Sequence, residues 1–256
     1  MVARDAAVNA GLEPRGDGPP VINAHGQPVG ADLAPPWQPP PWPPREPLQG
    51  RWCTLEPLDA HRHGPSLVEA AAAEPTGASW TYLPYGPFAS PQAHLDWLRD
   101  MAGKPDPQFF AIVDAAGCPV GVAAYMRIEP RHGVIEIGHL HFSPALQRTP
   151  AATEALSLLI GRAIELGYRR VEWKCDSHNA PSRRAAERLG FRFEGIFRQH
   201  MVIKGRNRDT AWFGLTDGDW ARLRPVHQRW LSADNFDAQG RQRTALSTLT
   251  RAACAG

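Results

Sequence analysis

The sequence has few cysteines and no long apolar run. The four cysteines, Cys53, Cys118, Cys175 and Cys254, form no CxxC pair. Their spacing excludes both a common zinc motif and a disulfide framework, so we expect reduced thiols, no bound metal and a cytoplasmic location. No run of about 18 apolar residues occurs, and the N-terminus lacks the apolar stretch of a signal peptide. The sequence therefore predicts no membrane segment and no membrane partner.

The chain also lacks a large net charge, since its formal charge is +2 over 256 residues. This near balance disfavours a long nucleic acid as a partner. The charges are unevenly placed, however: residues 141–210 hold 13 basic and 7 acidic residues. A locally positive region suits a compact polyanionic ligand, although a solvated helix face would have the same composition.

Proline is concentrated at one end, with 12 of the 26 prolines in residues 1–50. Proline removes a backbone donor and fixes φ, so this segment is expected to be extended. We predict that residues 1–50 form an N-terminal extension wrapping the domain, with Trp37 and Trp42 docked on its surface. A ligand for a proline-binding module is the alternative. Residues 51–232 are predicted to form one domain, and residues 233–256 a polar, loosely packed C-terminal tail.

Hydrophobic periodicity predicts the elements of this domain. Helices are expected over 59–74, 90–103, 150–166, 179–190 and 217–231, with Asp59, Ser90, Thr149, Asn179 and Asp217 at their starts. Strands are expected over 51–58, 133–142, 168–175, 191–205 and 208–216, and a hairpin over 108–128. The order of hairpins and crossover helices is typical of a mixed α/β fold.

Two helix starts and one strand carry the candidate chemistry. The strand–loop–helix over 133–166 presents free backbone N–H groups and the positive end of a helix dipole, which favour phosphate. A second helix start carries Asn179 and Ser182, with arginines behind them. The strand "EIGHLH" carries Glu136, His139 and His141, which can titrate.

These motifs resemble the GCN5-related N-acetyltransferase (GNAT) family, in its ribosomal-protein acetylating, RimJ/RimL-like branch. The resemblance covers about residues 51–231. It rests on Gln147 and the Ala-Thr-Glu that opens the long helix, followed by Asn179-x-x-Ser182 and Leu189-Gly-Phe. It implies the GNAT acyl-CoA N-acyltransferase fold, with a mixed, mostly antiparallel central sheet flanked by helices.

The resemblance implies acetyl-CoA as cofactor, with its pyrophosphate on the 146–152 loop and its pantetheine arm beside residues 140–142. The implied cofactor-binding residues are Leu140, His141, Phe142, Gln147, Arg148, Thr149, Ala151, Ala152, Thr153, Asn179, Ser182 and Arg184. Arg148 and Pro150 stand where the family usually has glycines. Glycine allows positive φ and a close approach to phosphate. We expect the Arg148 side chain to replace the lost backbone contacts.

The implied reaction is direct attack of an amine on the thioester carbonyl, with backbone N–H groups near residues 140–142 polarising it. Glu136 is the first candidate for the general base, and an ion-paired structural glutamate is the alternative. His139 and His141 are further candidates. The tyrosine that often protonates the thiolate is missing, since the matching region has Phe191, Phe193 and Phe197. Ser182 is the candidate acid, or simply part of a helix start.

The predicted acceptor site is an aromatic wall of Trp80, Tyr82, Tyr85 and Phe88. A packed loop is the alternative. The acceptor would be a small-molecule or peptide amine, including a protein N-terminus. The competing function is a non-catalytic acyl-CoA-binding module of the same fold. A nucleic-acid-binding domain using the arginines of 180–189 is disfavoured by the overall charge. The aromatic loop and the Pro-rich segment could both mediate a homodimer.

Overall fold

The computed structural model describes residues 20–254, and the chain divides into two units, Met1–Gln38 and Pro39–Gly256. In the first unit, β1 (Val21–Ile22) pairs antiparallel with β2 (Pro28–Val29). The part of the predicted N-terminal extension over 1–19 lies outside the described residues. The sheet and helices described next belong to the second unit.

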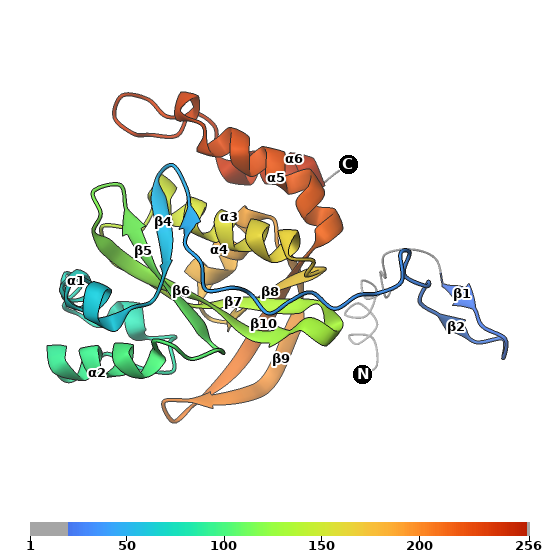
Figure 1. Ribbon diagram of the computed structural model, residues 1–256, viewed down its shortest axis with the longest axis horizontal. Coiled ribbons are helices and arrows are strands. Elements are labelled where there is room, and N and C mark those ends of the chain that lie inside the picture. The colour runs from blue at the N-terminus through green and yellow to red at the C-terminus, as the bar shows by residue number, and fades with distance from the viewer. Residues whose placement is uncertain (1–19, 255–256) are drawn as a thin grey trace, which may run out of the picture. The chain divides into compact units, whose positions relative to one another are not determined.

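The second unit is organised around an eight-stranded sheet in the order β3-β4-β5-β6-β7-β8-β10-β9 (Figure 1). Its strands are β3 (Leu48–Gln49), β4 (Cys53–Pro57), β5 (Gln108–Asp114), β6 (Pro119–Glu129), β7 (Val134–Phe142), β8 (Arg170–Asp176), β9 (Arg192–Ile203) and β10 (Arg206–Thr216). Only β7 and β8 are parallel, and the other neighbouring pairs are antiparallel. The predicted mixed, mostly antiparallel sheet is confirmed.

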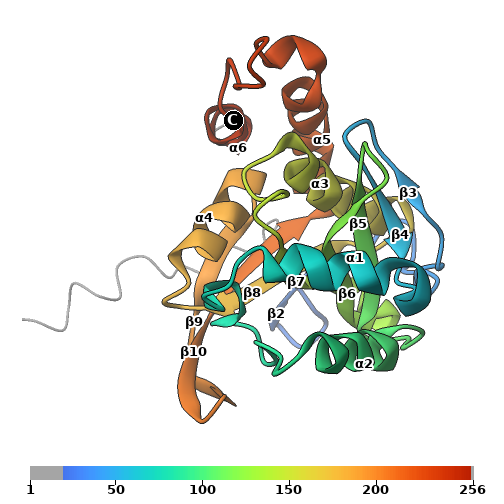
Figure 2. The ribbon, with the colours of Figure 1, turned by 90° about the vertical axis from the view of Figure 1, so that its left-hand side faces the viewer.

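Helices cover both faces of this sheet, as the two views show (Figures 1 and 2). They are α1 (Ala60–Ala72), α2 (Pro91–Met101), α3 (Pro150–Glu165), α4 (Ala180–Leu189), α5 (Asp217–Leu231) and α6 (Leu246–Cys254). Short 3-10 turns lie at Ala78–Trp80, Pro130–His132 and Ala233–Asn235. Side chains alternate along β5: Phe109 packs with α1 and α2, and Phe110 packs in the larger core with α3 and α5.

The helix starts follow from local hydrogen bonds. Asp59, Ser90 and Thr149 accept backbone N–H groups of their own helices, as predicted, and Asn179, expected at a helix start, does the same in α4. The predicted cap of α5 is wrong by one residue. Thr216, not Asp217, accepts from the N–H of Asp219, whose carboxylate accepts from the N–H of Thr216 in return. This reciprocal capping box satisfies two donors at once, which Asp217 alone would not do.

The C-terminal segment is not the loosely packed tail that its polarity suggested. It forms α6, which packs on α4 and α5, and Leu246 is buried in the main core. Phe236 contacts Trp52 and Trp230 edge to face, with ring centroids 5.4 and 5.2 Å away. A few apolar residues at helical spacing were enough to bury one face of this segment, despite its polar composition.

The proline-rich residues 39–50 lie against the domain through their carbonyl groups. The Pro41 carbonyl accepts from the Tyr168 hydroxyl, and the Pro44 carbonyl accepts from the Gln108 amide. Trp42 is 45% exposed, so its predicted docking is wrong. Trp37 belongs to the first unit and is half-buried. Hydrogen bonds to backbone oxygens, rather than tryptophan rings, hold this segment.

Candidate active site

The parallel pair β7 and β8 separates along its length. The two strands pair from Val134 with Arg170 to Glu136 with Glu172, and neither strand ends there. His139 has φ 53° at a register shift between β6 and β7, which is a β-bulge. A cavity of about 1120 Å³ lies where the strands separate. Unpaired backbone along both strands therefore borders a large open space.

The bulge changes which residues of β7 face the main core. Ile135 and Ile137 pack in that core, and the next β7 residues to contact it are Leu140 and Phe142. The step from 137 to 140 is three residues instead of the two of a regular strand, because the bulge adds one residue. Leu140 and Phe142 also line the cavity.

The start of α3 forms one end of the cavity. Gln147, Arg148, Thr149, Ala152 and Thr153 all line it. The first N–H groups of a helix have no partner within the helix, and the positive end of the dipole lies there. Arg148 is exposed and has φ 63°, a conformation that usually requires glycine. The backbone thus keeps the shape of a glycine loop while carrying a cationic side chain.

The start of α4 forms the facing wall. The Asn179 side-chain oxygen accepts from the N–H of Ser182 at 3.1 Å, and both residues line the cavity. The Ser182 hydroxyl oxygen accepts from the Trp173 indole at 3.0 Å. Because that oxygen is used as an acceptor, the hydroxyl hydrogen is left to donate elsewhere. Ser182 therefore keeps a hydrogen to donate, and the neighbouring Cys175 thiol is one acceptor within its reach.

Glu136 is buried and lines the cavity in a cluster of charges. The Lys174 ammonium lies 3.0 Å from its carboxylate and 2.7 Å from that of Glu172, and the Arg127 guanidinium lies 3.4 Å from Glu136. Burial raises the pKa of Glu136, and the nearby Lys174 and Arg127 only partly oppose this. A carboxylate with a raised pKa, held at a cavity wall, has the properties of a general base.

His139 lines the cavity, and its Nδ1 lies 3.2 Å from the Tyr85 hydroxyl. Burial lowers its pKa to about 4. The imidazole is therefore neutral at neutral pH and can accept a hydrogen bond. His141 is not among the lining residues. Its ring is stacked on Trp80 at a centroid distance of 3.7 Å, and its Nε2 lies 3.1 Å from the Ser79 hydroxyl.

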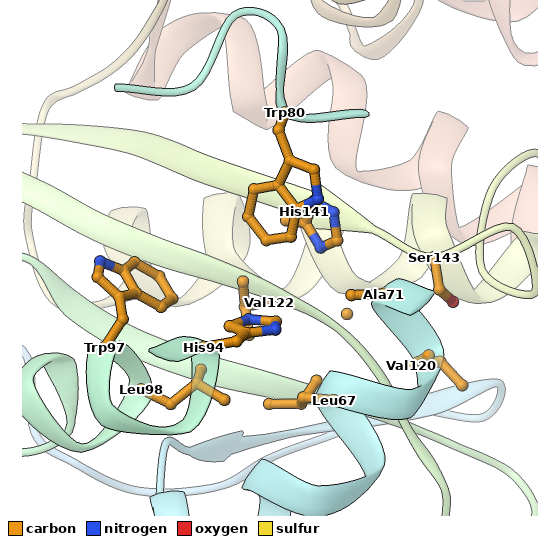
Figure 3. Close-up of a pocket in the computed structure, with 12 residues that line it drawn as sticks. Leu67, Ala71, Trp80, His94, Trp97, Leu98, Val120, Val122, His141 and Ser143 are labelled. Atoms are coloured by element: carbon orange, nitrogen blue, oxygen red, sulfur yellow. The ribbon is translucent and has the colours of Figure 1, made fainter. Parts of the chain in front are cut away.

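The predicted aromatic wall is divided between two environments. Tyr82 lines the large cavity, whereas Trp80, Tyr85 and Phe88 do not. Trp80 lies on His141 beside a separate pocket of about 10 Å³ between the sheet, α1 and α2 (Figure 3). That space holds about one water molecule. These three rings form a packed loop, because each is already covered by neighbouring rings.

Two other predicted cofactor residues lie off the cavity, Ala151 and Arg184. The Ala151 carbonyl is the acceptor of the Cys53 thiol. Cys175 lines the cavity, but burial raises its pKa, so its thiol stays protonated at neutral pH. A protonated thiol is a poor nucleophile, so Cys175 is not a candidate catalytic group.

Several cavity residues escaped the sequence analysis because they lie on separate elements. These are Arg127, Lys174, His200, Arg208, Trp230, Phe236 and Arg241. The surplus of basic residues over 141–210 was the only signal for some of them.

Among the described residues, no group of three or more His, Cys, Asp or Glu side chains could hold a metal ion. Within residues 20–254, no helix is both long and apolar enough to span a bilayer.

Acidification should destabilise the protein through its buried histidines. Burial lowers the pKa of four of them to about 4, His94, His139, His141 and His227. Their unfolded pKa is about 6.5, so the unfolded state gains protons first as the pH falls. Stability is full above about pH 6.5 and is lost between 6.5 and 4, by about 1–2 kcal/mol per histidine at pH 5.

Urea unfolding at pH 7.5 and pH 5.0 measures this loss. His227→Gln should reduce the pH dependence, whereas His61→Gln, at an exposed position of α1, should leave it unchanged. Equal pH dependence in the two variants would contradict the assignment to buried imidazoles.

Known proteins share this architecture. The family described as the acetyltransferase (GNAT) domain matches residues 53–192. A GCN5-related N-acetyltransferase from Brucella melitensis is 48% identical, with 86% of this chain and 100% of that one covered and a TM-score of 0.83. A probable GNAT acetyltransferase from Chromobacterium violaceum is 43% identical, covering 80% of this chain and 100% of its own, with a TM-score of 0.71.

A more distant likeness is RimL, a ribosomal alpha-N-protein acetyltransferase solved in complex with coenzyme A. It is 19% identical, covers 67% of this chain and 98% of its own, and has a TM-score of 0.58. At this identity the likeness shows the fold alone, so it does not establish the RimJ/RimL-like branch. The family match, by contrast, spans more than half of the chain. The chain therefore belongs to the GNAT family and is an N-acetyltransferase.

Proposed function

We propose that this enzyme transfers an acetyl group from acetyl-CoA to a primary amine by direct attack. The observation that carries the proposal is the cavity between the separated ends of β7 and β8, which the starts of α3 and α4 both border. GNAT acetyltransferases use acetyl-CoA. The described residues fit this group, because unpaired strand backbone, two helix starts and several cations border one space.

The cofactor would be held along the length of this cavity. Its phosphates would take the free N–H groups at the start of α3 and the side chain of Arg148. Its pantetheine amides would pair with the open backbone of β7 at residues 140–142, as an added strand would. Asn179 and Ser182 would lie beside the arm. When bound, acetyl-CoA supplies the activated thioester carbonyl.

The residues of the chain would then move the protons of the reaction. Glu136 would take a proton from the substrate ammonium through a water molecule, which leaves the amine free to attack, and neutral His139 would hold that water or the amine. Backbone N–H groups at residues 140–142 would stabilise the developing oxyanion. Ser182 would donate the proton that the departing sulfur needs. This assignment replaces the missing tyrosine with a hydroxyl that already borders the cavity.

The branch, acceptor and location are finer parts of the same proposal. The quoted sequence motifs favour the RimJ/RimL-like branch, in which the acceptor would be a protein N-terminus, and the open cavity also admits a small amine. The cysteine pattern favours the cytoplasm. A non-catalytic acyl-CoA-binding module stays the second candidate, because Pro150 removes a backbone donor from the phosphate loop.

Two measurements test the proposal. Calorimetric titration should show micromolar binding of acetyl-CoA, and Arg148→Ala should weaken it about tenfold, since a hydrogen bond to a charged group contributes about 1.5–3 kcal/mol. Arg99→Ala, on the exposed face of α2, is the control. Release of free thiol with a panel of amines shows turnover. Binding without thiol release would support the module, and no binding would overturn both functions.

A further inference from the structure

Basic side chains outnumber acidic ones where the acceptor would enter. The cavity wall beyond Glu136 is formed by residues of β6, β8, β9 and β10. The ion pairs beneath it balance, because three cations meet three carboxylates: Arg127, Arg170, Lys174, Glu136, Glu172 and Glu194. Arg208 lies on the same wall and stands outside this balanced set.

Arg208 is a half-buried cation without a carboxylate partner. Its Nε donates to the Thr210 hydroxyl at 3.2 Å, and that hydroxyl lies 2.9 Å from Nδ1 of His200. Within the described part of the chain, Arg208 forms no ion pair. Asp176 acts on it electrostatically, but the Asp176 carboxylate is already bonded to the backbone N–H and ring of His178.

This guanidinium has lost part of its hydration. Burial lowers the pKa of Arg208, and the attraction of the Asp176 and Glu136 carboxylates does not make up for it. A partly desolvated cation at a cavity wall binds an anion with little further desolvation cost, because folding has already removed part of its water. The Nε–H of the guanidinium is bonded to Thr210, so its terminal N–H groups remain to bind another acceptor.

We propose that Arg208 binds a carboxylate of the acceptor, so that the acceptor is a small amino acid rather than a simple amine or a protein N-terminus. A guanidinium matches a carboxylate through two parallel hydrogen bonds. Arg208 and the candidate base Glu136 line the same cavity, and the Glu136 carboxylate attracts the guanidinium electrostatically. An acceptor held there by its carboxylate has its amine within the same part of the cavity as Glu136. This inference rests on the proposed function.

Matched acceptor pools test the inference. One pool holds α-, β- and ω-amino acids, and the other holds the same compounds as primary amides, so that only the carboxylate differs. Thiol release should favour the acids at least about thirtyfold in kcat/KM. Arg208→Met should abolish this preference by raising KM for the acids. Arg208→Lys keeps the positive charge but cannot form two parallel hydrogen bonds, so it should retain part of the preference for the acids. Arg206→Met, at an exposed position of β10, is the matched control.

The outcomes separate this inference from the proposed function. A wild-type enzyme that acetylates both pools equally, or prefers the amides, overturns the inference and leaves acetyl transfer intact. Failure with both pools also overturns it, and simple amines and tripeptide amides then show whether acetyl transfer survives. An unchanged acid preference in Arg208→Met, with a normal melting temperature, would show that another residue binds the carboxylate and would overturn the inference.

Discussion

Replacing Glu154 by alanine should lower the free energy of unfolding by about 3–5 kcal/mol, since each orphaned buried donor costs about 1–3 kcal/mol. Glu154 is buried in α3, and its carboxylate accepts three successive backbone N–H groups at the entry to β4. The distances are 2.9 Å from Arg51, 2.6 Å from Trp52 and 2.9 Å from Cys53. The Ala-Thr-Glu motif thus ties the long helix to a strand about a hundred residues earlier.

Thermal unfolding measures this loss as a fall in Tm of about 10 °C for a domain of this size. Glu165→Ala is the matched control, because Glu165 lies in the same helix but forms an exposed pair with Arg224. An exposed pair contributes about 0–1 kcal/mol, so the control should unfold nearly like the wild type. If Glu154→Ala were equally stable, the hydrogen bonds to β4 would not be holding the strand in place.

Glu136→Gln should lower kcat by about 10²–10⁴-fold, the usual contribution of a general base. The amide keeps the size of the side chain but cannot accept the proton. Because burial raises the pKa of Glu136, the wild-type kcat/KM should fall as the pH drops through that pKa, since only the carboxylate form is active. This acid limb should disappear in the variant, and acetyl-CoA binding by calorimetry should persist.

Glu172→Gln separates catalysis from structure. Glu172 shares Lys174 with Glu136 but is not among the cavity residues. Burial would raise its pKa, but hydrogen bonds from Lys174 and Arg170 more than offset this and lower it. We expect a retained acid limb and a kcat within about fivefold of the wild type. Equal losses in both variants, with unchanged pH profiles, would make Glu136 a structural partner of Lys174.

Local sequence signals predicted the positions of most elements well. Asp59, Ser90 and Thr149 cap the helices that they were expected to cap, because a cap depends on groups three residues away. The C-terminal α6 was missed, because its apolar residues stabilise a helix only by packing on α4 and α5. A mostly polar sequence gives no sign that a helix forms through packing against other helices.

The candidate site was only partly predictable. The sequence indicated the helix starts at Thr149 and Asn179, since a motif lies within one continuous segment. It did not indicate that Arg208 faces the same cavity as Glu136, because 72 positions and a strand register separate them. Nor did the sequence indicate that Tyr82 lines the cavity while Trp80 is buried, since a loop sequence does not specify which of its rings other parts of the chain cover.

The sequence by itself therefore determined most of the elements, the caps at Asp59, Ser90 and Thr149, the mixed α/β class and the likeness to the acetyltransferase family, because these depend on residues close together in the chain. The tertiary structure decided which charged side chains line the cavity. The bulge at His139 and the end of the β7–β8 pairing at Glu136 open the sheet. Only that opening brings cations from three strands, β6, β8 and β10, to one wall, since side chains far apart in sequence meet through register and twist.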